Sequence, residues 1–104
     1  MLTERMTFQA KYGHGDELVA LFKEFFATQP PDSGILGARI YTDATGPMFT
    51  VVVESDFADM SALAAFDAKS QVMYGQADFQ EWFGRMMQVT ERGERQLLNM
   101  ERLS

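Results

Sequence analysis

Apolar residues recur at two different spacings along this 104-residue chain, and the order of the two spacings limits the folds it can adopt. Residues 2–10 alternate between apolar and polar side chains, which predicts a strand with one face buried. Residues 16–28 instead repeat apolar side chains at helical spacing, from Leu18 to Phe25, and predict an amphipathic helix. Two consecutive prolines then end this helix.

The middle of the chain predicts a hairpin followed by a second helix. Apolar and β-branched residues over 34–43 and 48–55 predict two strands. The turn-forming residues 44–47 between them favour antiparallel pairing. Asp56 is placed to cap a helix over 57–70, in which apolar residues again recur at helical spacing.

The last third of the chain predicts one more helical segment and a closing strand. Residues 71–76 interrupt the helical pattern, which resumes over 78–92 with an aromatic-rich stripe. Gly93 suits the left-handed position that often follows a helix C-terminus. Residues 94–103 carry four large apolar side chains and predict the last strand.

These elements give the order β-α-β-β-α-β, the split βαβ arrangement of ferredoxin-like domains. A chain of 104 residues has room for one domain, so we expect residues 1–104 to form a single α+β domain. Its sheet would be four-stranded and antiparallel. Two helices can cover only one face of such a sheet.

The predicted strands carry apolar residues on both faces, so we expect the uncovered face to be apolar too. The residues concerned are Phe49, Val51 and Val53 opposite Met48 and Val52 on the third strand, and Leu97 and Leu103 opposite Leu98 and Met100 on the fourth. An exposed patch of this kind is larger than monomers usually tolerate. We therefore expect the chain to form a homodimer through the open sheet face.

Charge and composition exclude several classes of partner and site. The net charge is -6 and the basic residues are scattered from Arg5 to Arg102, which argues against nucleic-acid binding. With no cysteine and a single histidine, we expect no metal site. The N-terminal residues lack the order of a signal peptide, and no apolar stretch approaches the ~20 residues of a membrane span. We therefore expect a cytoplasmic protein with no membrane partner.

Two titratable residues are candidates for chemistry. His14 precedes the first predicted helix, and histidine suits a general acid or base near neutral pH, although an exposed turn residue is the alternative. Glu4 lies on the apolar face of the first predicted strand, where a carboxylate needs a partner. Arg39, Arg95 or Arg102 could form an ion pair with it. Otherwise Glu4 is a pocket acid with a raised pKa.

Aromatic residues around the last predicted helix are candidates for ligand contact. Phe79, Phe83 and Met86 continue its apolar stripe and are assigned to the core. Trp82 suits either the core or a ligand-stacking role. Tyr74 lies in the predicted helix break, where its hydroxyl could reach a ligand.

Tyr41 and Arg39 share one face of the second predicted strand. Arginine binds carboxylates and phosphates through parallel N–H groups. The two residues therefore suit either an interface or the anchoring of an anionic ligand.

Two segments carry a resemblance to a known family. Residues 77–100, an aromatic-rich helix followed by Glu-Arg-Gly-Glu-Arg and a closing strand, are similar to small NIPSNAP-like proteins. The run Gly-His-Gly-Asp-Glu-Leu at 13–18 resembles the start of their first helix. With the element order, the whole chain resembles the dimeric α/β-barrel superfamily, which includes antibiotic-biosynthesis-monooxygenase-like domains. This resemblance implies two sheets packed face to face, helices outside, and a pocket between sheet and helices.

The resemblance also bears on cofactors. Haem-degrading members of the superfamily use an Asn, a Trp and a His around the haem. Trp82 could take the tryptophan role, but Asn99 is on the wrong strand and His14 on the wrong helix. The chain also has no Gly-rich phosphate loop and no Gly-x-Ser-x-Gly motif. We therefore expect no cofactor.

Two functions remain open at this point. One is a binding domain that holds a small apolar or aromatic molecule between sheet and helices. The alternative is a cofactor-independent monooxygenase or isomerase acting on a small aromatic or polyketide-like compound, with His14 and Tyr74 as catalytic candidates. An enzyme should bring His14, Glu4 or a tyrosine hydroxyl into one cavity with Trp82, whereas a binder needs only the cavity.

Overall fold

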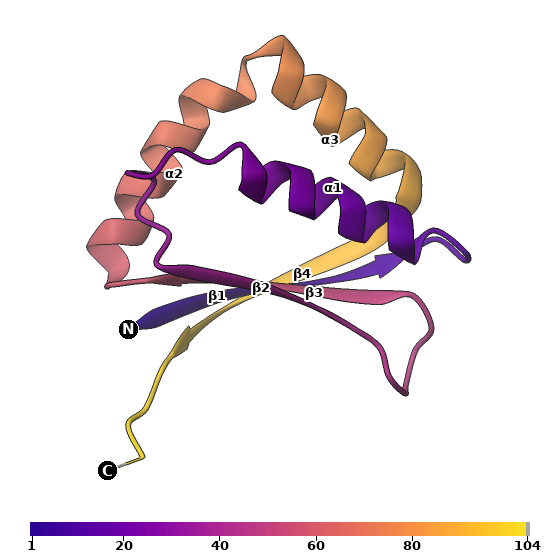
Figure 1. The fold of residues 1–104 in the computed structure, drawn as a ribbon, viewed down its shortest axis with the longest axis horizontal. Coiled ribbons are helices and arrows are strands. Elements are labelled where there is room, and N and C mark those ends of the chain that lie inside the picture. Colours follow the sequence, from indigo (N-terminus) through magenta and orange to yellow (C-terminus); the bar gives the residue numbers. More distant parts are fainter. Residues whose placement is uncertain (104) are drawn as a thin grey trace.

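The computed structural model describes residues 1–103 and consists of a four-stranded sheet with three helices on one face (Figure 1). In chain order the elements are β1 (Leu2–Ala10), α1 (Gly15–Ala27), β2 (Gly37–Thr42), β3 (Thr50–Phe57), α2 (Met60–Tyr74), α3 (Ala77–Val89) and β4 (Thr90–Asn99). The strands lie in the order β2-β3-β1-β4, and every neighbouring pair is antiparallel. The α+β ferredoxin-like architecture predicted from the element order is confirmed.

The alternation of β1 decides which side chains face the helices. Glu4 and Phe8 lie on the same side of this strand, as residues an even number of positions apart must. In β3, Ser55 lies directly opposite Glu4, and Val51 lies directly opposite Phe8, so their side chains face the helices as well. Arg95 of β4 joins them on this covered side.

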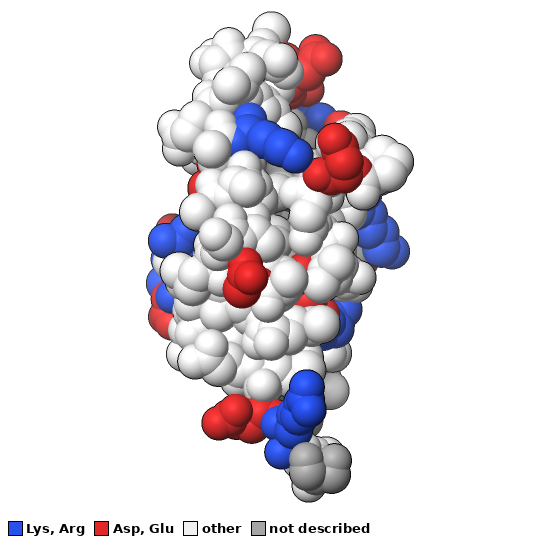
Figure 2. All heavy atoms as spheres, turned by 90° about the vertical axis from the view of Figure 1, so that its left-hand side faces the viewer, with Lys and Arg blue, Asp and Glu red and all other residues white. Residues whose placement is uncertain are grey.

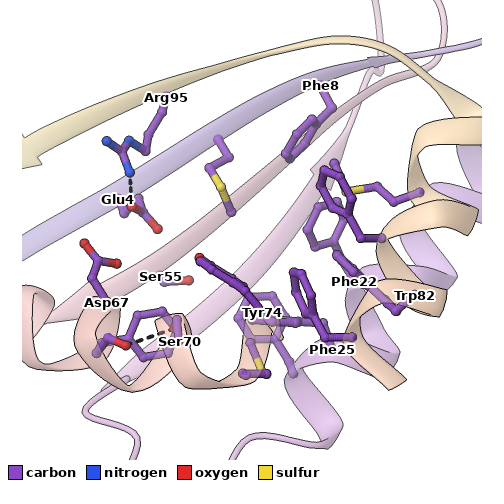
Figure 3. A pocket seen from close by; sticks show the side chains of 17 residues that line it. Glu4, Phe8, Phe22, Phe25, Ser55, Asp67, Ser70, Tyr74, Trp82 and Arg95 are labelled. Carbon is purple, nitrogen blue, oxygen red and sulfur yellow. Dashed lines mark hydrogen bonds and ion pairs between the residues drawn. The ribbon is translucent and has the colours of Figure 1, made fainter. Parts of the chain in front are cut away.

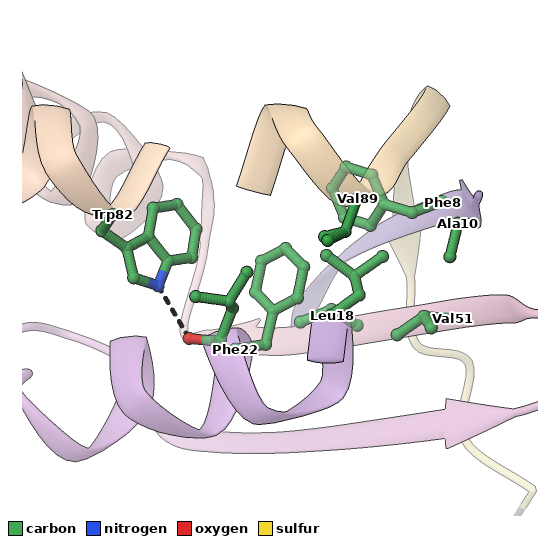
Figure 4. Close-up of a cluster of buried hydrophobic side chains, with 9 residues drawn as sticks. Phe8, Ala10, Leu18, Phe22, Val51, Trp82 and Val89 are labelled. Carbon is green, nitrogen blue, oxygen red and sulfur yellow. Dashed lines mark hydrogen bonds between the residues drawn. The ribbon is translucent and has the colours of Figure 1, made fainter. Parts of the chain in front are cut away.

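The hydrophobic core lies between the sheet and the helices α1 and α3 (Figure 4). Leu18 of α1 and Val51 of β3 have no exposed surface. The rings of Phe22 and Trp82 meet edge to face with centroids 5.6 Å apart. The indole N–H of Trp82 donates a 2.8 Å hydrogen bond to the backbone carbonyl of Leu21, which ties α3 to α1.

The helix α2 begins and ends later than the sequence predicted. Its N-cap is Asp59, whose side chain accepts a 2.9 Å hydrogen bond from the backbone N–H of Ala62. The prediction of Asp56 as the cap was wrong because Asp56 is still part of β3, where it binds an arginine. The helix continues to Tyr74, so the break expected over 71–76 is reduced to the two residues between α2 and α3.

Gly93 lies inside β4, and its assignment to a helix C-terminus was wrong. The strand begins at Thr90, directly after α3, and ends at Asn99, so it starts and stops earlier than the predicted 94–103. Gly93 is paired with Phe8, and a Cβ built on this glycine would lie 2.7 Å from Phe8 Cδ1. The position therefore requires glycine because an aromatic ring covers the strand there.

The uncovered face of the sheet is polar over most of its area, contrary to the sequence prediction. Val52 and Leu98 do lie on it, but Met48 precedes β3 and Met100 follows β4. The other residues of this face are mostly charged or polar: Thr3, Arg5, Thr7, Gln9, Arg39, Thr50, Glu54, Asp56, Arg92, Glu94 and Gln96. The prediction failed because the apolar residues at the strand ends were counted as strand.

A network of ion pairs organises this uncovered face. Glu54 accepts hydrogen bonds from Arg5 Nε at 2.7 Å and from Arg39 Nε at 2.8 Å. Asp56 accepts bonds from Arg39 Nη1 at 2.7 Å and from the hydroxyl of Thr3 at 2.8 Å. Burial alone would raise the pKa of Glu54, but the two arginines outweigh it and lower that pKa. The Arg39 guanidinium, helped by Thr3, lowers the pKa of Asp56.

Candidate functional site

A cavity of about 210 Å³ lies between the covered face of the sheet and the helices. It is lined from β1, β3 and β4 on one side and from all three helices on the other. Figure 3 shows that aromatic rings gather at one end of the cavity and polar side chains at the other. The two ends therefore offer different chemistry to a ligand.

The aromatic end is built around Trp82 of α3. The ring centroids of Phe22, Phe25 and Phe79 lie 5.6, 5.5 and 5.8 Å from that of Trp82. The indole N–H is already used by the backbone of Leu21, so Trp82 offers a ligand its ring and not its donor. This end can therefore stack or enclose an apolar ring.

The polar end is formed by Glu4, Ser55, Asp67 and Arg95 (Figure 3). Glu4 is buried, and its carboxylate lies 3.6 Å from the Arg95 guanidinium, which is longer than a hydrogen bond. Burial raises the pKa of Glu4; the Arg95 charge opposes this rise and the Asp67 charge adds to it. Of the three arginines proposed as partners from the sequence, Arg95 is the one that faces Glu4.

Tyr74 stands between the two ends. It is the last residue of α2, and its ring centroid lies 4.9 Å from that of Phe79. In Figure 3 its hydroxyl points from the helix toward the polar end of the cavity. Glu4, Tyr74 and Trp82, three of the residues selected from the sequence, therefore line the same cavity.

His14 lies away from this cavity. It is the residue before α1, and its Nδ1 lies 3.0 Å from a carboxylate oxygen of Glu17 in an exposed pair. This is the arrangement of a turn residue at a helix N-terminus. The structure does not bring it together with Glu4, Tyr74 or Trp82.

Arg39 and Tyr41 also lie elsewhere, on the uncovered face of the sheet. Arg39 is committed to Glu54 and Asp56, so it is not the partner of Glu4. Tyr41 is half-exposed and borders a shallow hollow together with Val52. These two residues share a face as predicted, but they have no part in the cavity.

Sequence reasoning missed Asp67, Ser55 and Ser70, which also line the cavity. A signal for Asp67 was present, since it lies four residues after the buried Leu63 and three before the buried Ser70 on α2. Helical spacing thus placed a carboxylate beside the inner face of the helix. No local pattern indicated that it would meet Glu4.

Residues 1–103 contain neither a cluster of metal ligands nor a membrane-spanning helix. This part of the chain contains no group of three His, Asp or Glu side chains that could hold a metal ion. None of its helices is long and apolar enough to cross a membrane. On the face seen in Figure 2, basic and acidic side chains are scattered without a patch of one sign.

Comparison with known proteins finds similarity in structure alone. A comparison with protein-family models finds no match, and a sequence comparison with curated proteins finds none either. A NIPSNAP family protein from Agrobacterium tumefaciens superposes with a TM-score of 0.77 at 21% identity, over 99% of this chain and 95% of that one. An uncharacterised NIPSNAP domain protein from Burkholderia xenovorans gives a TM-score of 0.70 at 20% identity, over 100% and 98%.

A third similar structure belongs to a protein with a stated activity. SnoaB, a cofactor-independent oxygenase from Streptomyces nogalater, superposes with a TM-score of 0.67 at 18% identity, over 97% of this chain and 93% of that one. An antibiotic biosynthesis monooxygenase gives a similar TM-score of 0.68. At these identities the likeness establishes the fold. The chain therefore has the ferredoxin-like fold that NIPSNAP proteins share with antibiotic biosynthesis monooxygenases.

Proposed function

We propose that this protein binds a small aromatic molecule of one or two rings in the cavity between sheet and helices. The observation that carries the proposal is the cavity itself, about 210 Å³ and walled at one end by aromatic rings. A cavity of about 150 Å³ lined by apolar side chains is enough to hold benzene. Pockets for drug-sized ligands start at about 300 Å³. The size thus favours a compound of one or two rings over a larger polycyclic one.

The packing around the aromatic end supports the same proposal. Phe22 and Trp82 are buried, and Trp82 is held by its hydrogen bond to Leu21. A ligand ring would therefore meet rings that are already ordered, so little side-chain entropy is lost on binding. The buried apolar surface of the ligand supplies the driving force.

Ethylbenzene is a suitable probe because it has one ring and no polar group. A ligand that binds only the folded state raises the melting temperature. We expect ethylbenzene to raise it, and to change the emission of Trp82, the single tryptophan of the chain. Ser70→Met places a larger side chain in the cavity from α2 and should abolish both effects. Ser61→Met, at an exposed position on the same helix, is the matched control and should retain them.

The result that contradicts the proposal is equally specific. If ethylbenzene changes neither the melting temperature nor the Trp82 emission of the wild-type protein, the cavity does not bind aromatic molecules. If both changes persist in Ser70→Met, binding occurs elsewhere.

A second candidate function is catalysis without a cofactor, by an isomerase or a monooxygenase. It is favoured by the convergence of Glu4 and Tyr74 on the cavity that Trp82 lines. A raised pKa makes the ionised carboxylate a stronger base, which can take a proton from one carbon of a ligand and, as the carboxylic acid, return it to another. Tyr74 would supply a hydrogen bond, and His14, outside the cavity, has no role in this version.

Proton transfer can be tested with 2-tetralone, a two-ring ketone with acidic C–H groups. An enzyme of this kind should speed the exchange of those protons with heavy water, as followed by NMR. Glu4→Gln should remove the acceleration. Equal exchange rates with wild type and Glu4→Gln would leave binding as the supported function.

The proposal extends to a homodimer in which a second copy covers the open sheet face. Tyr41, Val52 and Leu98 provide apolar contacts there. Glu54 and Asp56 already have arginine partners, so covering this face would leave neither carboxylate unpaired. Tyr41 and Arg39 would then be interface residues and not ligand contacts.

A further inference from the structure

The polar end of the cavity has more negative than positive charge. Two carboxylates, those of Glu4 and Asp67, line it, whereas Arg95 contributes one guanidinium. The Arg95 side chain is 61% exposed, so water screens much of its charge, while only 10% of the Glu4 side chain is exposed. The balance at this end is therefore negative.

Within residues 1–103 no hydrogen bond reaches the Glu4 carboxylate, although the hydroxyls of Ser55 and Tyr74 line the same cavity. The Ser70 hydroxyl donates to the backbone carbonyl of Phe66 at 2.9 Å, so its proton is already used. The Arg95 guanidinium lies 3.6 Å from the Glu4 carboxylate, which is too far for a hydrogen bond. A buried carboxylate left without donors is costly unless something supplies them. A ligand that brings several donors would remove this cost.

We infer that the ligand of this cavity is an arylalkylamine, whose ring occupies the aromatic end and whose ammonium group lies between Glu4 and Asp67. The inference rests on the proposed function and adds a chemical class to it. In Figure 3 the carboxyl groups of Glu4 and Asp67 face each other across the polar end. An ammonium group carries three N–H donors and one positive charge, and so meets both deficits. Tyr74 and Phe66, aromatic residues of a kind that attracts cations, also line the cavity.

Other ligand classes fit this end less well. An aromatic carboxylate would meet two carboxylates for one guanidinium, and like charges in a poorly solvated site repel strongly. A neutral alcohol or phenol has one O–H donor and can satisfy only one carboxylate. The charge and the donor count thus favour the cation.

Four probes of similar size test the inference by isothermal titration calorimetry at pH 7: 2-phenylethylamine, 2-phenylethanol, 3-phenylpropionate and ethylbenzene. We expect the amine to bind at least about tenfold more tightly than the alcohol, since charge-assisted hydrogen bonds are the stronger kind. The carboxylate should bind most weakly. Glu4→Gln should remove most of the advantage of the amine while leaving ethylbenzene binding unchanged.

Two further variants keep the test decisive. Asp67→Asn, on the outer wall of the cavity, should also weaken the amine selectively, and it serves if Glu4→Gln does not fold. Glu94→Gln removes an exposed carboxylate on the opposite face of the sheet and should change nothing.

The outcomes separate this inference from the proposed function. If ethylbenzene and the alcohol bind as tightly as the amine, or if the preference for the amine survives in both Glu4→Gln and Asp67→Asn, the inference is wrong while the cavity remains a binding site. If none of the four compounds binds, the proposed function fails with it.

Discussion

At Glu4, folding favours an apolar side chain, whereas the proposed ligand binding uses a carboxylate. Its position on β1 puts it on the covered face of the sheet among Met6 and Phe8, where an apolar residue would pack without cost. Burial raises the pKa of its carboxyl, and Arg95 only partly opposes the rise. A position that lowers stability in the free protein is typical of functional sites.

The raised pKa of Glu4 gives stability a defined pH dependence. The folded protein holds this proton more tightly than the unfolded chain, whose Glu pKa is about 4.3. The contribution to stability is therefore present below that value and is lost as pH rises through the folded pKa. We expect Glu4→Gln to unfold at higher urea concentration than wild type at pH 7, and the difference to shrink as the pH falls through the raised folded pKa and to be smallest below about 4.

Asp67 and Arg95, the charged groups that face Glu4, are the same in wild type and in Glu4→Gln. The difference in stability between the two proteins therefore reports on Glu4. The control is Glu91→Gln, at an exposed position near the start of β4, which should follow wild type at every pH. A Glu4→Gln variant less stable than wild type at pH 7 would show that the carboxylate is well stabilised in the free protein.

At the scale of elements, β4 depends on a glycine that permits contact with a core ring. Gly93→Ala would put a Cβ 2.7 Å from Phe8 Cδ1, and the Phe8 ring is held in place by stacking on Phe22. We expect this substitution to lower the free energy of unfolding by about 2 kcal/mol, as overpacking a core does.

Gly84→Ala is the matched control for Gly93→Ala. Gly84 lies in α3, and a Cβ there would meet nothing within 4 Å. Alanine should stabilise the helix by about 0.5 to 1 kcal/mol. Urea unfolding of both variants measures the two effects; a Gly93→Ala variant as stable as wild type would contradict the account of β4.

Sequence patterns predicted which face of an element a residue lies on better than where the element begins and ends. The alternation of β1 was enough to place Glu4 on the covered face, because the period of a strand fixes the side of each residue. Helical spacing likewise placed Trp82 on the inner face of α3. The ends of elements were less predictable, since Asp56 and Asp59 are equally good caps and strand pairing decides which one is used.

The meeting of Glu4, Tyr74 and Asp67 could not be read from the chain. It depends on the strand order and on the angle at which α2 leaves the sheet, both of which are set by tertiary packing (Figure 1). The polarity of the uncovered face escaped prediction for a related reason. Arg5, Arg39 and their carboxylate partners come from three strands and form a network only when these strands pair.

At the scale of the whole molecule, no element among residues 1–103 covers the second face of the sheet (Figure 1). We expect sedimentation equilibrium at micromolar concentration to give the mass of two chains. Tyr41→Asp puts a charge at an exposed aromatic position of the proposed interface and should shift the protein to monomers. Val72→Asp, at an exposed apolar position on α2, is the control and should leave the dimer intact. A monomeric wild-type protein would refute the dimer without affecting the cavity.

Binding of a small aromatic molecule in the cavity beside Trp82 is tested most directly by NMR. The chain has a single tryptophan, so its indole N–H gives one unambiguous signal in a 1H–15N spectrum. On titration with ethylbenzene, we predict that this signal and the backbone amides of Ser55 and Ser70 shift together and saturate. An indole signal that does not shift would contradict this binding. The same holds if the signals that shift are those near Tyr41.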